Sequence, residues 1–334
     1  MGRRRNERAA RTRARDRRRR LALAGAAIVV VLGATAAVVL ARWNATEPDG
    51  TVERAAPVDM ARDGSPAWSP DGTRLAFYSE RDGNGEIYVI NADGTGERRL
   101  TRSASDEGYP WWSPDGTTIT FDSDEAGTFD IHAMDADGGN VRRLTTHEGR
   151  EVSASWSPDG ERIVFMSDRE GAFDVYAMSV DGKEVHRLTS TGSSWFPVYS
   201  ADGARLAFHV GRDIVVMPAS GGALTRLTQD PANGMYPSWS PDGERLAFMS
   251  WRNGRTEIFV MNADGTGQRR LVSMPPGDAI DPRWSPDGSR IVFVHLPGGA
   301  QSAERSLWLV NADGSGLHAL TGPDASSSPF DRRP

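Results

Sequence analysis

Histidine, arginine and carboxylate side chains are the groups from which acid–base chemistry near neutral pH is built. Most histidines of the 334-residue chain lie in or beside segments with the pattern of β-strands, where we interpret them as surface residues of outer strands; the six are His132, His147, His186, His209, His295 and His318. His147 differs, because it lies in a loop together with Glu148, Arg150 and Glu151. This cluster is the best candidate for catalysis in the chain.

Other chemistry has weaker support. Asp122 and Asp124 alternate before Asp130, but the glycine and closing glutamate of a calcium loop are missing. The chain has no cysteine, which excludes disulfides, thiolate metal sites and a cysteine nucleophile. The Gly-x-Ser-x-Gly elbow, the His-Glu-x-x-His pair and the phosphate-binding loop are missing as well. We therefore expect no catalytic residue, no bound metal and no cofactor.

A binding surface is the stronger expectation. Five segments, which we expect to be loops, differ from one another in sequence and carry aromatic and charged side chains: 102–110, 146–154, 190–197, 229–237 and 273–282. Aromatic residues with mixed charge suit a protein or carbohydrate partner. The expected binding residues are Glu107, Tyr109, His147, Arg150, Glu151, Trp195, Phe196, Tyr236, Asp278 and Asp281. Trp111 and Phe196 could instead serve packing, whereas Trp195 follows small polar residues and is expected to be exposed.

The elements that must position these residues form a repeat. Ser-Pro-Asp-Gly starts at Ser69, Ser113, Ser157, Ser240 and Ser285, and a degenerate copy starts at Ser200. The intervals between successive copies are 44, 44, 43, 40 and 45 residues. Six copies at this period indicate an all-β fold, a β-propeller with six blades of four strands each.

Each copy repeats more than its turn. An aromatic residue precedes every turn: Trp68, Trp112, Trp156, Tyr199, Trp239 and Trp284. A phenylalanine recurs in the strand that follows: Phe77, Phe121, Phe165, Phe208, Phe248 and Phe293. Stacking sheets around an axis buries both faces of each sheet, so these rings are expected to fill the space between blades. The variable segments then enter the innermost strands and surround one end of the central channel.

These motifs resemble the repeat of TolB-like propellers, which is related to the WD-type repeat, and the resemblance covers about residues 52–322. It implies a propeller over 58–322. It implies less about function, because such repeats occur in periplasmic scaffolds, in peptidase accessory domains and in sugar-processing enzymes. Proteins of the TolB type also carry a separate α/β domain before the propeller, where about a dozen tether residues stand here. Either 52–56 or 317–321 is expected to complete the last blade.

The N-terminal part predicts a membrane anchor. Residues 21–40 are uncharged, and twenty residues of helix span a bilayer core. Residues 1–20 hold eleven arginines against two acids, a net charge of 11 − 2 = +9, which keeps that flank in the cytoplasm. We expect a basic cytoplasmic tail at 1–20, a transmembrane signal anchor at 21–40, a tether at 41–57 and a disordered tail at 323–334. A signal peptide cleaved at Ala34-Thr35-Ala36 is the alternative.

Charge excludes one class of partner. The chain carries −6, so the part after residue 20 carries −6 − 9 = −15, and nucleic acid requires a positive surface. We therefore predict a membrane-anchored scaffold with a periplasmic or extracellular propeller that binds a protein or glycan partner in the cell envelope. The alternatives are an envelope enzyme acting on saccharides or peptides through His147 and Arg150, and a transmembrane sensor that signals through its basic tail.

Overall fold

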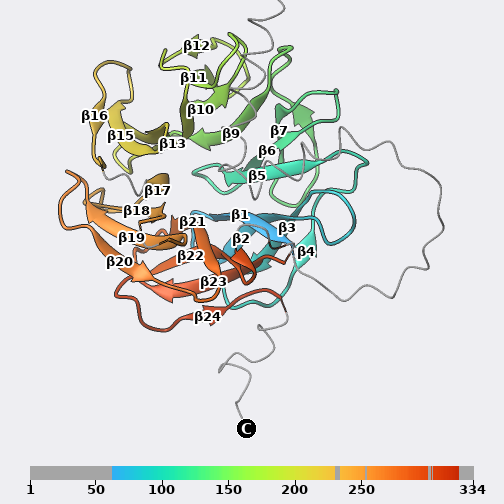
Figure 1. Cartoon of the computed structure of the whole chain (residues 1–334). Helices are drawn as coiled ribbons and strands as arrows, with labels where there is room; N and C mark the ends of the chain where they lie inside the picture. Colours follow the sequence, from blue (N-terminus) through green and yellow to red (C-terminus); the bar gives the residue numbers. More distant parts are fainter. Residues whose placement is uncertain (1–61, 230–233, 253, 300–301, 303, 323–334) are drawn as a thin grey trace, which may run out of the picture. The chain divides into compact units, whose positions relative to one another are not determined.

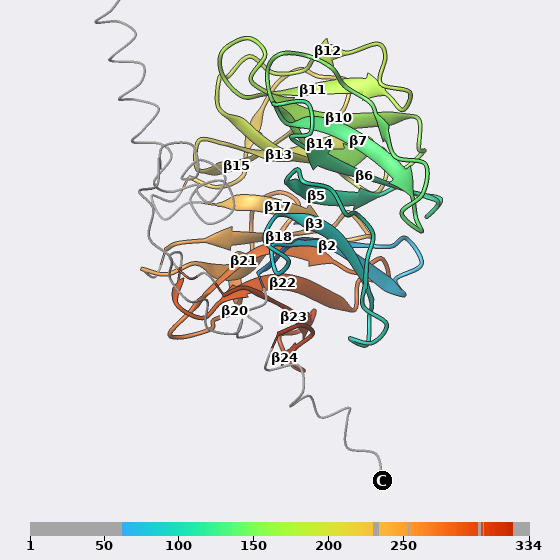
Figure 2. The same ribbon diagram turned by 90° about the vertical axis from the view of Figure 1, so that its right-hand side faces the viewer.

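The computed structural model describes residues 62–229, 234–252, 254–299, 302 and 304–322. Within these residues, twenty-four strands form six antiparallel sheets, each built from four consecutive strands. The sheets stand around a common centre as the blades of a propeller (Figures 1 and 2). This confirms the predicted all-β, six-bladed architecture.

The strands of each blade run outward from the centre in chain order. Blade 1 contains β1 (Asp63–Trp68), β2 (Arg74–Ser79), β3 (Glu86–Asn91) and β4 (Arg98–Arg99). Blade 2 contains β5 (Glu107–Trp112), β6 (Thr118–Ser123), β7 (Asp130–Asp135) and β8 (Arg142–Arg143). Blade 3 contains β9 (Glu151–Trp156), β10 (Arg162–Ser167), β11 (Asp174–Ser179) and β12 (His186–Arg187). Blade 4 contains β13 (Ser194–Tyr199), β14 (Arg205–Val210), β15 (Asp213–Pro218) and β16 (Thr225–Arg226). Blade 5 contains β17 (Met235–Trp239), β18 (Arg245–Ser250), β19 (Glu257–Asn262) and β20 (Arg269–Val272). Blade 6 contains β21 (Asp278–Trp284), β22 (Arg290–Leu296), β23 (Ser306–Asn311) and β24 (His318–Ala319).

The repeated turn joins the first two strands of every blade. In blade 1 the Ser69 hydroxyl donates to Asp71 at 2.6 Å and accepts the Arg74 amide at 2.9 Å. The hydrogen bond from Ser69 holds the pKa of Asp71 below its usual value. Gly72 has a φ of 68°, which glycine adopts without strain. The degenerate copy keeps the Ser200–Asp202 bond at 2.5 Å, so the turn survives without its proline.

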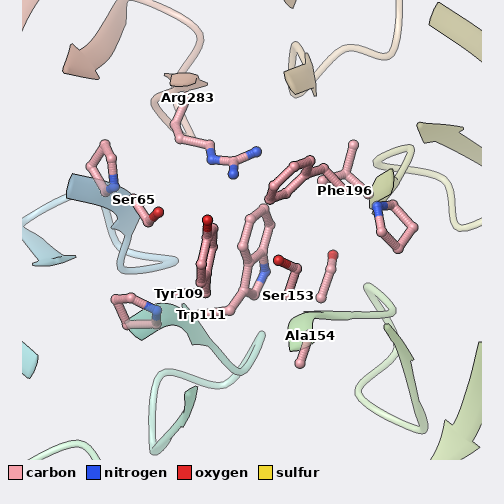
Figure 3. Close-up of a pocket in the computed structure, with 12 residues that line it drawn as sticks. Ser65, Tyr109, Trp111, Ser153, Ala154, Phe196 and Arg283 are labelled. Atoms are coloured by element: carbon pink, nitrogen blue, oxygen red, sulfur yellow. The ribbon is translucent and has the colours of Figure 1, made fainter. Parts of the chain in front are cut away.

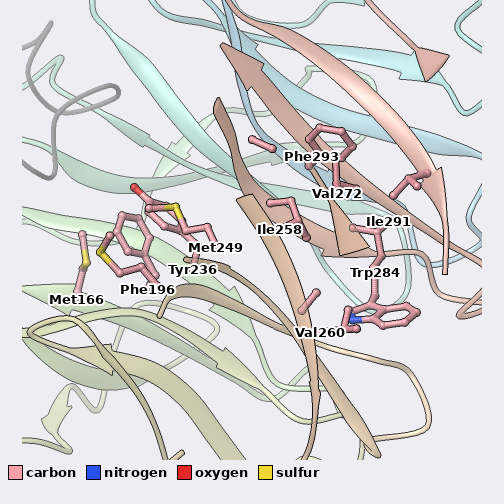
Figure 4. Close-up of a cluster of buried hydrophobic side chains, with 14 of the residues drawn as sticks. Met166, Phe196, Tyr236, Met249, Ile258, Val260, Val272, Trp284, Ile291 and Phe293 are labelled. Carbon is pink, nitrogen blue, oxygen red and sulfur yellow. The ribbon is translucent and has the colours of Figure 1, made fainter. Parts of the chain in front are cut away.

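The repeated rings pack between and within the blades. All six phenylalanines of the second strands are at most 2% exposed. Figure 4 shows the part of the core where Trp284, Ile291 and Phe293 of blade 6 lie near Ile258 and Val260 of β19. An arginine that opens the second strand also covers the aromatic ring of the next blade in four places: Arg74 over Trp112, Arg205 over Trp239, Arg245 over Trp284 and Arg290 over Trp68.

The ring closes between blades 6 and 1. The segment 317–321 supplies β24, which pairs with β23 and completes blade 6, whereas 52–56 lies outside the described residues. Arg62 forms a parallel bridge with Arg305, and the Asp63 amide donates to the Arg305 carbonyl at 3.2 Å. The Trp68 indole donates to the Arg283 carbonyl at 3.3 Å.

The expected anchor, tail and tether also lie outside the described residues, as does the expected C-terminal tail at 323–334. Across the part of the chain that the structure describes, no helix has the length and apolar character needed to cross a membrane.

Candidate functional site

Every innermost strand is bulged at the same position, three residues before its closing aromatic residue. The residue there has a left-handed backbone, and these six residues are Ser65, Tyr109, Ser153, Phe196, Tyr236 and Asp281, with φ between 47° and 57°. This conformation costs a non-glycine residue roughly 1–2 kcal/mol. The register of each pair shifts at this point, for example between Gly108 and Trp111. All six blades share the bulge, so it belongs to the architecture of the propeller. At the bulged position the blades differ in the side chain that they carry.

The central channel is filled by Trp111 of β5. Its ring lies between the left-handed residues Tyr109 and Phe196, and the Arg283 guanidinium lies 4.9 Å from the ring centre (Figure 3). The cavity that remains has a volume of about 20 Å³, enough for roughly a single water molecule. Trp111 therefore serves packing, and a ligand of any size must bind outside this constriction.

One side of the channel is polar. The Arg283 guanidinium forms an ion pair with Asp281 at 2.9 Å, and both side chains are buried. Burial raises the pKa of the Asp281 carboxyl, while Arg283 and then Ser65 oppose the rise. Nearby, Arg305 donates to the Tyr78 hydroxyl at 2.8 Å, and burial raises the pKa of Tyr78 to about 12. This side is a network of buried charges, which suits structural rigidity more than turnover.

The opposite side is aromatic. Phe196 lies 4.1 Å from Tyr236 and 5.7 Å from Tyr109, measured between ring centres. His209 is fully buried and lies 5.7 Å from Phe196. Burial lowers the pKa of His209 to about 4, so the imidazole is neutral at physiological pH and behaves as one more aromatic ring.

The aromatic contacts continue outward to the surface. Half-buried Trp195 lies 4.5 Å from Phe173, and the exposed Arg150 guanidinium lies 4.7 Å from the Phe173 ring. Arg150 also pairs with Asp168 at 2.8 Å, which holds it in place. His209 links the two groups of rings, because its ring centre lies 5.7 Å from Phe196 and 6.4 Å from Trp195. We call the set Tyr109, Phe196, Tyr236, Trp195, Phe173 and Arg150 the aromatic row. It runs from the channel to the segments of blade 3 just before β9 and β11, which hold Arg150 and Phe173.

Five of the ten expected binding residues lie in the aromatic row, and Asp281 belongs to the polar network with Arg283. The other four have separate structural partners. Glu107 accepts from Ser103 at 2.6 Å, Glu151 pairs with Arg169, and Asp278 accepts the Thr256 amide at 2.7 Å. His147 accepts the Gly149 amide at 2.9 Å.

The placement of several expected residues in loops was wrong. Glu107, Glu151 and Asp278 open β5, β9 and β21, because each pairs with the second strand of its blade; Glu107, for example, lies opposite Ser123. Tyr109, Phe196, Tyr236 and Asp281 lie further inside these strands.

The histidines also need a correction. His132 and His209 are 4% and 0% exposed, so they are not surface residues. Each stands where most other blades have an apolar or aromatic side chain, and the strand pattern alone does not show that such a histidine is buried. Phe173 and His209 were missed as members or neighbours of the aromatic row, since neither belongs to the variable segments.

The three acidic residues of the possible calcium loop each interact with a different group. Asp122 accepts the Ser153 amide at 2.9 Å, Asp124 accepts the Asp106 amide at 2.9 Å, and Asp130 pairs with Arg143 at 2.7 Å. Among the described residues, no group of three or more histidine, aspartate or glutamate side chains is arranged to hold a metal ion.

Sequence comparison identifies the repeat. The family model described as the TolB beta propeller domain matches residues 53–191, 127–213 and 192–330. The Tol-Pal system protein TolB of Syntrophus aciditrophicus is 44% identical over 50 residues, which are 15% of this chain and 11% of that protein. The corresponding protein of Actinobacillus succinogenes is 49% identical over 39 residues, 12% of this chain and 9% of that protein. The chain thus spans about a tenth of the curated relatives it matches.

Solved structures agree with the fold. TolB from Acinetobacter baumannii superposes with a TM-score of 0.61 and 28% identity, over 67% of this chain and 57% of that one. The tricorn protease superposes with a TM-score of 0.63 at 17% identity, over 78% of this chain and 26% of that one. An oligogalacturonate lyase from Vibrio parahaemolyticus gives a TM-score of 0.55 at 16% identity, over 79% of each chain. At such identities the two enzymes show the shared fold alone.

Proposed function

Because the chain belongs to the TolB β-propeller family, we propose that it is a binding scaffold of the cell envelope that captures a protein or glycan partner on the aromatic row. The observation that carries the proposal is the continuity of this row, through His209, from the filled channel to exposed Arg150. The curated relatives that the chain matches are Tol-Pal system proteins, and this supports a location in the cell envelope.

The chemistry of the row suits a macromolecule or an oligosaccharide. Tryptophan, tyrosine and arginine are the residues that most often dominate binding energy at interfaces. Trp195 and Arg150 present such side chains at the surface, and Asp168 and Phe173 hold them in position. Since the channel retains only about 20 Å³, a small substrate has no enclosed site along it.

We also propose that the protein acts without catalysis. His147 and Arg150, the candidate pair for an enzyme, are each engaged locally, with the Gly149 amide and with Asp168. An assay of the full-length protein on saccharides and peptides, with and without divalent metal, is expected to give no turnover. Turnover that His147→Ala abolishes would contradict the scaffold proposal.

The proposed location rests on the N-terminal sequence. We place residues 1–20 in the cytoplasm, 21–40 in the membrane and the propeller outside the cytoplasm, periplasmic or extracellular. Protease added outside the cytoplasmic membrane should digest the propeller of the full-length protein and spare the basic tail. A mature protein beginning near residue 37 would instead support the signal-peptide alternative.

The test of the binding function is capture from crosslinked cell envelopes. The full-length wild type is compared with Trp195→Ala/Arg150→Ala, and Val185→Ala/Glu161→Ala serves as a control at exposed positions outside the aromatic row. We expect a discrete partner with the wild type and the control, and its loss with the double variant. Equal capture by all three proteins would remove the aromatic row as the binding surface.

A further inference from the structure

The six blades allow one to be compared with the others, and blade 2 departs from a pattern that blades 1, 3 and 5 share. In those three blades an arginine two residues after the second strand lies over the ring of the third strand. Arg81 lies 4.9 Å from the Tyr88 ring, Arg169 lies 4.7 Å from Tyr176, and Arg252 lies 4.3 Å from Phe259. The Nε atom of each arginine also donates to the serine that ends the second strand: Ser79, Ser167 and Ser250.

In blades 1 and 3 the same arginine neutralises a buried carboxylate at the start of the innermost strand. Arg81 pairs with Asp63 at 2.8 Å, and Arg169 pairs with Glu151. Both carboxylate side chains are fully buried. The guanidinium thus occupies a defined place, between a ring, a serine and a buried carboxylate.

Blade 2 keeps the surroundings of this place and lacks the guanidinium. Glu107 opens the innermost strand opposite Ser123, as Asp63 does opposite Ser79. His132 stacks on Phe121 at 5.6 Å, as Tyr88 stacks on Phe77 at 5.7 Å. Glu125, however, stands where blades 1, 3 and 5 have the arginine.

Three features accompany this replacement. A cleft of about 230 Å³ opens at the outer strands, lined by Glu125, Ala126, His132, Val141, Arg142 and Arg143. His132 is only 4% exposed, and its Nε2 atom meets the Glu125 carboxylate at 4.0 Å without a hydrogen bond among the described residues. The Oε2 atom of buried Glu107 has no hydrogen-bond partner in the described part either. Glu107 therefore lacks the cation that its counterparts Asp63 and Glu151 possess.

We propose that this cleft, which we call the blade 2 cleft, binds the guanidinium of an arginine side chain supplied by a partner protein. The incoming group would take the place that Arg81 and Arg169 occupy in their own blades. It would stack on the His132 ring and pair with the Glu125 carboxylate, as guanidinium groups do on aromatic rings and carboxylates. This site goes beyond the aromatic row and does not depend on it.

The basic residues at the cleft do not fill this role themselves. Arg143 is committed to Asp130 at 2.7 Å. Arg142 is exposed, and no ion pair joins it to Glu125 in the described part of the chain. A divalent metal is the less suitable occupant, because no third histidine or carboxylate is arranged to complete its coordination.

The experiment uses the full-length protein labelled with ¹⁵N in its histidines and a small probe, N-acetyl-arginine methylamide. We expect the His132 signal to shift saturably with the probe, with half-saturation at a concentration on the order of 1–30 mM. The neutral citrulline analogue should cause less than about a fifth of that shift. Equal shifts with both probes, or no saturation below about 100 mM, would overturn the proposal. Because the probe is a small molecule, this result stands apart from the capture of any envelope partner.

Two variants locate the effect. Glu125→Arg restores the pattern of blades 1, 3 and 5 with an internal guanidinium, so it should fold and lose the response to the probe. Glu125→Gln keeps the size of the side chain and should weaken the response at least about fivefold. Glu161→Arg, the same charge change at an exposed turn, should respond like the wild type. A full response in Glu125→Arg, or a response to Zn²⁺ in place of the guanidinium probe, would contradict the assignment.

Discussion

Glu107 is a buried carboxyl group without an ion pair in the described part of the chain, whereas its counterparts Asp63 in blade 1 and Glu151 in blade 3 each pair with an arginine. It accepts hydrogen bonds from Ser103 at 2.6 Å and Ser123 at 3.3 Å. Burial is the largest cause that raises the pKa of Glu107 to about 8, and the nearby Glu86 carboxyl adds to the rise. The two serine hydroxyls oppose it. The carboxyl is therefore protonated in the folded protein at neutral pH.

This protonation makes stability depend on pH. Between the usual pKa of 4.5 and about 8, the folded chain holds a proton at Glu107 that the unfolded chain releases. The free energy of unfolding should thus fall as pH rises through this window. Glu107→Gln should remove the fall and exceed the wild type by about 1–3 kcal/mol at pH 8.5, with little difference at pH 5. Urea unfolding at several pH values measures this, and parallel pH profiles would contradict it.

The Asp281–Arg283 pair gives a second prediction at single residues. Arg283→Met leaves the Asp281 carboxylate buried without its cation and should cost about 3–5 kcal/mol of unfolding free energy. Adding Asp281→Asn removes the uncompensated charge and should recover most of that loss. The double-mutant cycle is measured by denaturant unfolding. Losses that simply add would show that the two side chains do not stabilise each other.

Among single residues, the sequence predicted ten binding residues in the variable segments, and five of these ten lie in the aromatic row. It could not indicate that Trp111 fills the channel, because a tryptophan next to a repeated tryptophan fits either face of a strand. The burial of His209 and His132 was also hidden. Each stands where most other blades have an apolar or aromatic side chain, and a single histidine has the same sequence pattern whether buried or exposed.

At the scale of the strand, a threonine closes most blades. Its hydroxyl accepts the amide of the second residue of the third strand in five blades, through Thr101, Thr145, Thr189, Thr228 and Thr321. In blade 5 the corresponding residue is Val272, which has no hydroxyl; β20 runs on to this residue, and it pairs with Ile258. The threonine of the Leu-Thr motif thus ends the outer strand, and its hydroxyl keeps the buried amide of the third strand hydrogen-bonded.

This hydrogen bond predicts that two substitutions change the free energy of unfolding by different amounts. Thr101→Val keeps the shape and leaves the Ile87 amide, now bonded at 2.8 Å, without the hydroxyl, so it should cost about 1–3 kcal/mol. Ser273→Ala removes a partly exposed hydroxyl that lies one residue beyond Val272 in blade 5, so it should change the unfolding free energy by less than about 0.5 kcal/mol. Thermal or urea unfolding compares them. Similar losses for both would mean that the hydroxyl does not matter.

Strand order and turn position were predictable, because proline, aspartate and glycine recur at fixed offsets. The bulges were not. Tyr109 and Phe196 have side chains that favour extended strands, yet their φ values are 48° and 56°. Packing around the axis imposes this conformation, so the local sequence pattern does not predict it. For the same reason, the first residues of β5, β9 and β21 looked like loop residues.

At the scale of the whole molecule, closure depends on blade 1 packing against blade 6. The Trp68 indole and the Arg283 carbonyl form a buried hydrogen bond across this junction at 3.3 Å. The equivalent indole of Trp239, between blades 4 and 5, is buried without a hydrogen-bond partner among the described residues. The repeat predicted the number of blades, but the choice between 52–56 and 317–321 needed the structure.

These two tryptophans form a matched pair for testing closure. Trp68→Phe and Trp239→Phe remove the same volume, and the first also removes the junction hydrogen bond. Trp68→Phe should therefore destabilise the protein by about 0.5–1.5 kcal/mol more than Trp239→Phe. Melting temperatures and urea midpoints give the comparison, and a larger loss for Trp239→Phe would contradict this account of closure.

The central claim is that the aromatic row is the surface that meets an envelope partner. The most direct measurement places a photocrosslinking amino acid in the full-length protein in living cells, at Trp195 in one strain and at exposed Val185 of blade 3 in another. The account predicts a discrete crosslinked species from position 195 and none from position 185. Adducts of equal strength from both positions, or from position 185 alone, would contradict it.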